Sequence, residues 1–289
     1  TLGRLNSNEN AGSNGAGASA TAVPPSHLPA QRSDEVFAAE RAVLKTYDPH
    51  TSQWGEKDVL IQIHRKPFSE GTMRAAYRMK VLQGLDVRGR DRDWVVKLSK
   101  DPKEDPKQYW RDVQMQMEAG MYAERYNQIA GVPKKVTFLE IFVAVLPDRA
   151  GSPACVIERF VPGKYSKYND NWAWSDESRN TPQAFSHWSW EASGHVQLIC
   201  DLQGVGDVLT DPQIHTIDGR GYGRGNAGLP GVRKFFLHHR CNCICQALGL
   251  RSVTGKVKGP VDNGTQWHGG VKEANRKRQR MLESASVGL

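Results

Sequence analysis

Residues Asp201–Thr216 read DLQGVGDVLTDPQIHT, and this stretch decides how the rest of the chain is interpreted. The apolar run VQLIC ends directly before it at Cys200, so we expect Asp201 at the end of a buried strand. Asp201 and Gln203 are two positions apart and would face the same side of a straight strand. Their carboxylate and amide oxygens are hard ligands that suit Mg²⁺ bound together with phosphates.

A second acidic residue of this stretch, Asp211, precedes Pro212 in a predicted turn. A loop carboxylate beside a metal ion can orient or deprotonate a hydroxyl nucleophile. Ordinary turn and cap residues also produce an Asp-x-Gln spacing. The spacing alone therefore does not decide between a metal site and a structural turn.

The flanking sequence mixes strand-like and helix-like periodicity. Apolar runs and alternation predict strands over Val59–Ile63, Ala75–Leu82, Trp94–Leu98, Val136–Val145, Ala154–Phe160 and Leu198–Leu202. Helices are predicted over Tyr109–Ile129, which contains no proline, and over Lys234–Leu248. Strands that come first, one helix among them and a mixed second half together predict an α+β fold with two lobes.

The two ends of the chain differ in composition from its middle. Residues 1–34 are rich in small and polar residues and lack aromatics, so we expect a disordered leader. Residues 253–289 are expected to form a disordered basic tail, because about five of the eight net positive charges lie from Arg251 onward. Its basic run 276–280 is interpreted as solvated, with nuclear import or an acidic partner as the alternative. The body is only weakly basic, so we expect no nucleic-acid partner.

The cysteines indicate a metal site rather than a disulfide framework. Three of the five, Cys241, Cys243 and Cys245, fall within five residues, and His239 precedes them. On a helix, Cys241 and Cys245 would share a face and could bind one ion, although Cys243 and His238 compete as ligands. A closed tetrahedral site needs a fourth donor from elsewhere. The thiols favour a reducing compartment, and we predict a cytoplasmic protein, with nuclear entry through the basic tail as the alternative.

Two further functions are disfavoured by the sequence. No apolar run of about 18 residues occurs, so we expect no membrane segment. The loop GYGRGNAG contains the G-x-G-x-x-G spacing of dinucleotide sites at Gly223, Gly225 and Gly228. A polar turn precedes it and the cysteine cluster follows about 20 residues on, which is the wrong context for that motif. Its glycines instead permit positive φ and close backbone approach.

The whole string Asp201–Thr216 resembles the metal and catalytic segment of the alpha-kinases, the family of myosin heavy chain kinases, elongation-factor-2 kinase and the channel-linked kinases. Other segments are similar to that family in the same order: FSEGTMRAAYRM, DWVVKLSK, VIERFVPGKYSKYNDN, QAFSHWSWEASG, GYGRGNAG and KFFLHHRCNCICQALGL. The resemblance covers residues 35–252. The ordinary protein-kinase signatures GxGxxGxV, HRD and DFG are absent from the sequence.

The resemblance implies a role for particular residues. Lys97 should contact the α and β phosphates of ATP, and Arg74 should reach the phosphates from the loop above. Glu158 should lie at the adenine edge, and Lys164 should help to place the phosphates or the catalytic loop. Asp201 and Gln203 should hold Mg²⁺, and Asp211 should be the catalytic carboxylate. Gly223, Gly225 and Gly228 should belong to the nucleotide-binding residues, in a loop that lies near the groove for a peptide.

The resemblance also implies the architecture and the second metal. We expect an atypical protein-kinase-like α+β fold, with an N-lobe over residues 35–161 and a C-lobe over residues 162–252. The family's position for the fourth zinc ligand falls on His187, so a structural Zn²⁺ is expected at His187, His239, Cys241 and Cys245. The expected function is Mg-dependent phosphorylation of Ser or Thr in protein substrates, with Thr preferred. The alternative is a catalytically silent domain of this fold that binds a nucleotide or a partner.

Overall fold

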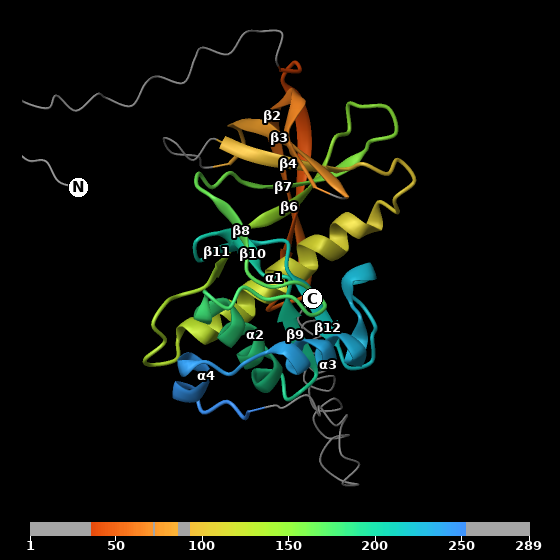
Figure 1. Ribbon diagram of the computed structural model, residues 1–289. Coiled ribbons are helices and arrows are strands. Elements are labelled where there is room, and N and C mark those ends of the chain that lie inside the picture. Colours follow the sequence, from red (N-terminus) through yellow and green to blue (C-terminus); the bar gives the residue numbers. More distant parts are fainter. Residues whose placement is uncertain (1–35, 72, 86–92, 253–289) are drawn as a thin grey trace, which may run out of the picture. The chain divides into compact units, whose positions relative to one another are not determined.

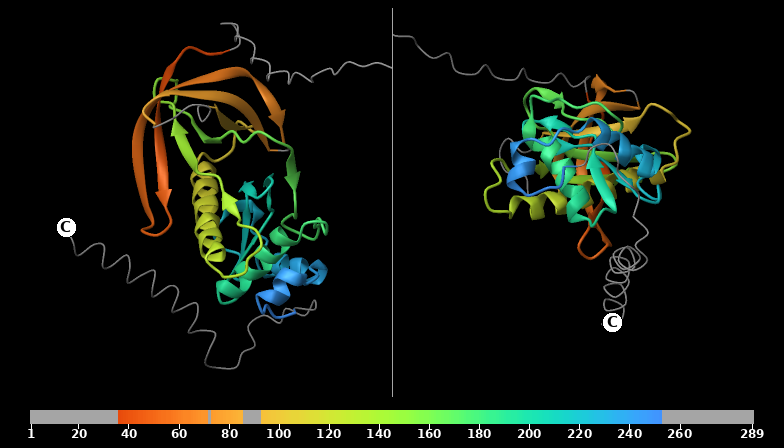
Figure 2. Two further views of the ribbon diagram at one scale, coloured as in Figure 1. Left: turned by 90° about the vertical axis from the view of Figure 1, so that its left-hand side faces the viewer. Right: turned by 60° about the horizontal axis from the view of Figure 1, so that its bottom comes forward.

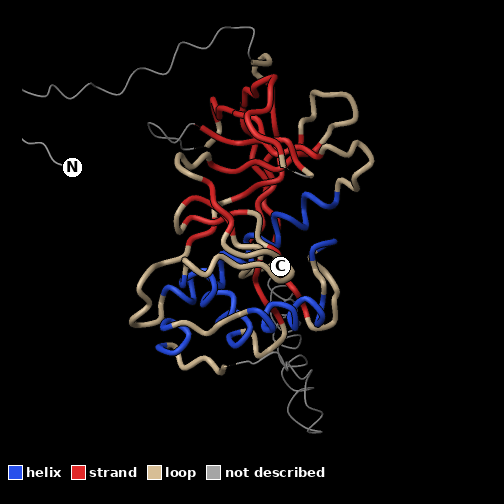
Figure 3. Tube along the Cα trace, viewed as in Figure 1, coloured by secondary structure: helices blue, strands red, loops and turns tan. Residues whose placement is uncertain are grey.

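The computed structural model describes residues 36–71, 73–85 and 93–252 (Figure 1). The leader predicted over residues 1–34 and the tail predicted over residues 253–289 lie outside these described residues. Strands are concentrated in the N-terminal half of the described chain and most helices in the C-terminal half (Figure 3). No helix of the described part is long and apolar enough to cross a bilayer.

Six antiparallel strands of the N-terminal half form a closed barrel in the order β1-β2-β3-β4-β7-β6. Their bounds are β1 Glu40–Asp48, β2 Gln53–Glu70, β3 Arg74–Gln83, β4 Asp93–Ser99, β6 Ile141–Val145 and β7 Ala154–Arg159. Alternate side chains such as Val59, Ile61 and Ile63 point into a buried core around Trp94. Closure leaves no exposed sheet edge in this barrel. The predicted strands at 59–63, 75–82, 94–98 and 154–160 are confirmed, whereas β1 was not predicted.

Helix α1 (Lys107–Asn127) connects the barrel to the rest of the molecule. Its first turns pack Tyr109 and Val113 against barrel residues including Val143 and Val156. Its later turns pack Ala119, Tyr122 and other residues into a second core formed by the C-terminal elements. The predicted helix Tyr109–Ile129 is confirmed within two residues at each end. One helix thus belongs to both hydrophobic cores.

The C-terminal half contains two small sheets with helices beside them (Figure 1). One sheet has the order β5-β11-β10-β8, and the other pairs β12 with β9. The strands are β5 Thr137–Phe138, β8 Tyr165–Lys167, β9 Gln197–Cys200, β10 Gln203–Val205, β11 Val208–Thr210 and β12 Gln213–Thr216. The helices are α2 Asn180–Ala192, η3 Gly223–Gly225, α3 Gly228–His238 and α4 Cys243–Ala247. Because β5 pairs with β11, the run Val136–Val145 divides between the two halves.

Two local predictions were wrong. The expected strand Leu198–Leu202 ends at Cys200, because Asp201 adopts a left-handed φ of 56° and Gln203 begins a strand of the other sheet. The expected helix Lys234–Leu248 is interrupted, because His239 is extended and Asn242 starts α4 by accepting hydrogen bonds from the N–H groups of Ile244 and Cys245. Cys241 and Cys245 therefore do not share a helix face.

Candidate functional site

A cavity of about 710 Å³ is lined by both halves of the molecule. Helix α1 and strand β4 provide one side, and the turns after β9 and β11 together with η3 provide the other. The predicted site residues that line this cavity are Arg74, Lys97, Asp201, Gln203, Asp211, Gly223 and Gly225. Arg74 and Gly225 are 151 positions apart in the sequence, yet both line this cavity.

Lys97 on β4 lies at the centre of an ionic cluster. Its Nζ is 2.8 Å from Glu158 Oε1 on the adjacent strand β7 and 2.5 Å from Asp211 Oδ2. Burial disfavours the charged amine, but the two carboxylates outweigh burial and raise the pKa of Lys97. The amine is therefore a fixed cation, which is the form needed to contact phosphate oxygens.

Glu158 does not line the cavity, although the sequence placed it at an adenine edge. Its side chain is buried and is committed to Lys97 and to the hydroxyl of Thr210, which donates to the carboxylate. In this structure Glu158 therefore forms an ion pair with Lys97 outside the cavity lining. The strand register explains this, because positions 158 and 97 lie on the same face of paired strands.

Asp211 occupies a left-handed turn between β11 and β12, with φ of 51°. Its backbone N–H donates to Oε1 of Gln116 at 2.8 Å, and Gln116 Nε2 donates to the carbonyl oxygen of Leu139 at 2.8 Å. Gln116 is only 1% exposed, and its Oε1 also lies 3.2 Å from the Thr210 hydroxyl oxygen. The sequence analysis missed Gln116. Its signal was a polar side chain on the apolar stripe of α1, between Val113 and Ala119.

The predicted magnesium ligands face the same cavity in spite of the kink at Asp201. Asp201 Oδ1 is 2.7 Å from Lys167 Nζ on β8, and Gln203 Nε2 donates to the Asp211 carbonyl at 3.2 Å. Burial raises the pKa of Asp201 against the opposing effect of Lys167, so this carboxylate gains from a nearby cation. A buried carboxylate and an amide oxygen on one cavity wall fit the donor set of Mg²⁺.

The lysine of this segment that reaches the site is Lys167, not Lys164. Lys164 is exposed and does not line the cavity. Lys167 lies opposite Gln203 in the β8–β10 pairing, which brings its amine to Asp201. Neither lysine lines the cavity itself, but Lys167 contacts a residue that does, whereas the role expected of Lys164 stays a prediction.

Arg74 lies at the edge of the cavity, where acidic residues hold it. Its guanidinium is paired with Glu104 and with Asp112, the latter at 2.8 Å, and it lies 4.7 Å from the ring centroid of Tyr109. Burial lowers the pKa of Arg74, but these carboxylates outweigh burial and raise it. The guanidinium can reach phosphates only by exchanging these carboxylates for them.

The glycine loop closes the other side of the cavity. A Cβ added to Gly225 would lie 1.7 Å from Gln213 Oε1, so only glycine fits there without movement of that side chain. Gly223 and Gly225 line the cavity, whereas Gly228 begins α3 with φ of 64° and does not line it. The expected binding role is thus supported by position for two of the three glycines.

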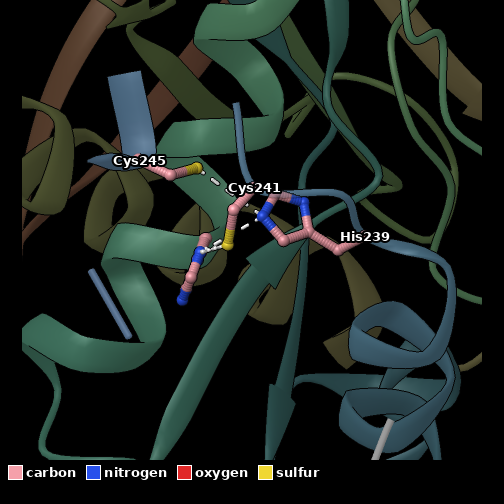
Figure 4. A group of neighbouring side chains, drawn as sticks. His239, Cys241 and Cys245 are labelled. Carbon is pink, nitrogen blue, oxygen red and sulfur yellow. Dashed lines mark hydrogen bonds between the residues drawn. The ribbon is translucent and has the colours of Figure 1, made fainter. Parts of the chain in front are cut away.

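The predicted metal ligands form a separate cluster. One nitrogen or sulfur atom from each of His187, His239, Cys241 and Cys245 lies within 4.8 Å of the others (Figure 4). His187 Nδ1 is 3.1 Å from His239 Nε2 and 3.6 Å from Cys241 Sγ, and Cys245 Sγ is 3.6 Å from His239 Nε2. A tetrahedral Zn²⁺ separates its nitrogen and sulfur ligands by roughly 3.3–3.8 Å. The four residues could therefore hold one metal ion, and their nitrogen and sulfur donors are those that Zn²⁺ prefers.

The electrostatics and the neighbours of the cluster agree with this fit. Burial, together with His187, lowers the pKa of His239 to about 4, so the ring is neutral as a metal ligand requires. The competing residues are elsewhere, because Cys243 is exposed and His238 bonds the carbonyl oxygen of Lys234. The break between α3 and α4, rather than a shared helix face, brings His239 and Cys241 to Cys245.

The chain is similar in sequence to one family of known proteins. The model of the alpha-kinase family matches residues 69–245. Alpha-protein kinase 1 of Dictyostelium discoideum is 45% identical over 218 residues, which are 75% of this chain and 16% of that protein. Myosin heavy chain kinase B of Dictyostelium discoideum is 45% identical over 222 residues, which are 75% of this chain and 30% of that protein. The chain thus spans less than a third of these relatives.

The fold is also similar to a solved structure. The crystal structure of an inactive variant of the alpha-kinase domain of myosin heavy chain kinase A, in complex with ATP, matches with a TM-score of 0.69 and 33% identity. The match covers 74% of this chain and 100% of that domain. The described residues therefore contain the counterpart of a complete domain of this kind.

Proposed function

The chain belongs to the alpha-kinase family, and on this premise we propose that it is a protein Ser/Thr kinase that prefers Thr. It transfers the γ-phosphoryl group of ATP to a hydroxyl of a protein substrate in the presence of Mg²⁺. A cytoplasmic location belongs to the same proposal and is supported by five free cysteines. The domain boundaries proposed are 35–252 for the catalytic domain, with its lobes meeting near Pro162.

One observation carries this proposal. Lys97, Asp201, Gln203 and Asp211 come from separate strands and turns, and all four line one cavity of about 710 Å³. Two carboxylates and an amide oxygen can hold a metal and a nucleophile, and the buried ammonium can hold phosphate oxygens. Gathering the largely covered ions of Lys97 and Asp201 here costs desolvation energy, which supports a functional use for the cluster.

In the proposed reaction, Asp211 accepts the proton of the acceptor hydroxyl as its oxygen forms a bond to the γ-phosphorus. The bond from that phosphorus to the bridging oxygen of ADP breaks, and ADP keeps the electron pair. Lys97 leaves its contact with Asp211 to bind phosphate oxygens, which frees that carboxylate for the hydroxyl. Gln116 keeps Asp211 in position by accepting a hydrogen bond from the Asp211 backbone N–H.

The two metals have different proposed roles. Asp201 and Gln203 would hold Mg²⁺, which neutralises phosphate charge when bound. Lys167 neutralises Asp201 and keeps its carboxylate turned toward the cavity. His187, His239, Cys241 and Cys245 would hold a structural Zn²⁺ that joins α2 to the segment after α3. Four protein ligands leave no open position for catalysis at that ion.

The test is transfer of labelled phosphate from ATP to a Thr peptide by the full chain with Mg²⁺. Asp211→Asn should abolish transfer while ATP binding persists, and Asp148→Asn, at an exposed aspartate away from the cavity, should leave transfer unchanged. A Ser version of the peptide should be phosphorylated more slowly. No transfer by folded, zinc-loaded protein would favour the silent binding domain instead.

A further inference from the structure

A second cavity, of about 610 Å³, lies between α1 and the hairpin of β1 and β2. The hairpin extends beyond the barrel and runs beside α1 (Figure 2). The two cavities use opposite faces of that helix. At 100° per residue, Gln108, Asp112 and Met115 of the catalytic cavity point away from Met117, Met121 and Glu124 of this outer groove.

The outer groove has an apolar floor and an acidic rim. Met117, Met121 and Phe138 contribute apolar surface, and Trp54 of the hairpin is 38% exposed beside them. Methionines adapt to varied apolar partners. The ionised groups that line the groove are the acidic residues Asp48, Glu124 and Glu140, and no lysine or arginine is among its lining residues. His50 faces Glu124 at 3.7 Å and is exposed.

A glycine inside α1 keeps this groove open. Gly120 lines the groove in the middle of a helix, where glycine costs about 1 kcal/mol relative to alanine. Its helical φ does not require glycine, and an added Cβ would meet only Phe138 Cβ at 3.9 Å, an ordinary contact. The described structure therefore leaves room for a methyl group at this position, whereas a longer side chain would extend into the groove.

We propose that this groove binds a basic amphipathic helical segment of a partner protein. The apolar face of such a segment would cover Met117, Met121 and Trp54, and its lysines or arginines would meet the acidic rim. The complementarity is local, because the chain as a whole carries a net charge of +8. A basic partner is therefore attracted to this rim although the whole chain repels it.

Binding at the groove reaches the catalytic turn through Gln116. This buried side chain lines both cavities, and it accepts the hydrogen bond of the Asp211 N–H at 2.8 Å. A segment that contacts α1 at Gly120 thus lies one helical turn from Gln116, the residue that positions Asp211. The effect of groove binding on Asp211 matters for activity only if the proposed kinase function is correct. Binding of the segment to the groove does not depend on that function.

The test is fluorescence anisotropy of a labelled amphipathic Leu/Lys peptide with the full chain. We expect saturable binding that Gly120→Met weakens by about tenfold or more, because the new side chain fills the groove. Gly120→Ala is the matched control and should bind within about twofold, since its Cβ is accommodated. Neutralising the rim with Asp48→Asn and Glu140→Gln should weaken binding and reduce its salt dependence.

Three results would overturn the proposal. The first is that a Leu/Glu peptide binds as tightly as the Leu/Lys peptide. The second is that Gly120→Met binds the Leu/Lys peptide with the affinity of the wild type. The third is that the peptide binds only after the basic run 276–280 of the chain is neutralised. The last would assign the groove to the chain's own tail. Hydrogen exchange over residues 208–213 should change on peptide binding, and an unchanged rate would refute the coupling. None of these readouts needs phosphate transfer, so they stand apart from the kinase assay.

Discussion

Replacing Gln116 by methionine should damage catalysis more than its distance in sequence from Asp211 would suggest. The two side chains have similar volume, so packing is retained and the hydrogen bonds are lost. Two partners are left unpaired, the Asp211 N–H and the Leu139 carbonyl, each now bonded at 2.8 Å. At about 1–3 kcal/mol for each unpaired group, the free energy of unfolding should fall by roughly 2–6 kcal/mol. Loss of the fixed Asp211 position should lower kcat by about 10- to 100-fold.

The assay compares kcat, KM for ATP and Tm of Gln116→Met with those of Gln116→Glu. The glutamate variant keeps an acceptor for the Asp211 N–H and loses the donor to Leu139, so its kcat should fall less. Its new carboxylate would lie near Glu158, which makes stability the property more affected in that variant. A methionine variant with lowered Tm and unchanged kcat would refute the positioning role and leave Gln116 only a structural one.

Three further outcomes are expected. Cys245→Ser should lose bound zinc, and with it up to about 4 kcal/mol of stability when free zinc is about 1,000-fold above Kd. Zinc content and Tm measure the two losses, and the control Cys243→Ser, at an exposed cysteine, should show neither. Burial lowers the pKa of His215 below the 6.5 of an unfolded histidine, so the contribution of its neutral ring to stability is complete above that pH and decreases as the pH falls. His215→Gln should therefore flatten the slope of unfolding free energy against pH by at most about 1.4 kcal/mol per pH unit, measured in urea titrations. Gly225→Ala should raise KM for the peptide more than KM for ATP, because its Cβ displaces Gln213 beside the glycine loop.

The sequence predicted elements best where periodicity is simple. The β2 residues Val59, Ile61 and Ile63 alternate cleanly, and all three are buried. Strand β1 was missed because its inward residues are Ala42, Leu44 and Tyr47, which break the alternation after the second position. Ala42 is small, and the spacing between buried residues changes from two to three positions at Tyr47, so the alternating pattern typical of a strand is weak in this stretch.

Residues of the site could be named from the sequence, but their contacts could not. The resemblance named Lys97 and Asp211, whereas their ion pair joins positions 114 apart. No local rule predicts such closure, because it depends on how α1 joins two hydrophobic cores. Lys164 precedes β8 whereas Lys167 is its last residue, and the β8–β10 pairing places the Lys167 amine beside Asp201. The four residues predicted to bind zinc do lie together, although Cys241 and Cys245 were expected on one continuous helix that the structure interrupts.

The two aspartates that line the cavity, Asp201 and Asp211, share a backbone conformation that decides how their proposed roles should be tested. Asp201 and Asp211 have φ of 56° and 51°, a left-handed conformation that costs an ordinary residue about 1–2 kcal/mol. Aspartate and asparagine tolerate it best, because their short polar side chains bond locally. Each turn directs a carboxylate out of the strand path and into the cavity. Alanine at either position would remove the charge and add backbone strain together, whereas asparagine removes only the charge. A loss of transfer in Asp211→Asn therefore reports on chemistry, and any additional loss in Asp211→Ala reports on the turn that aims it.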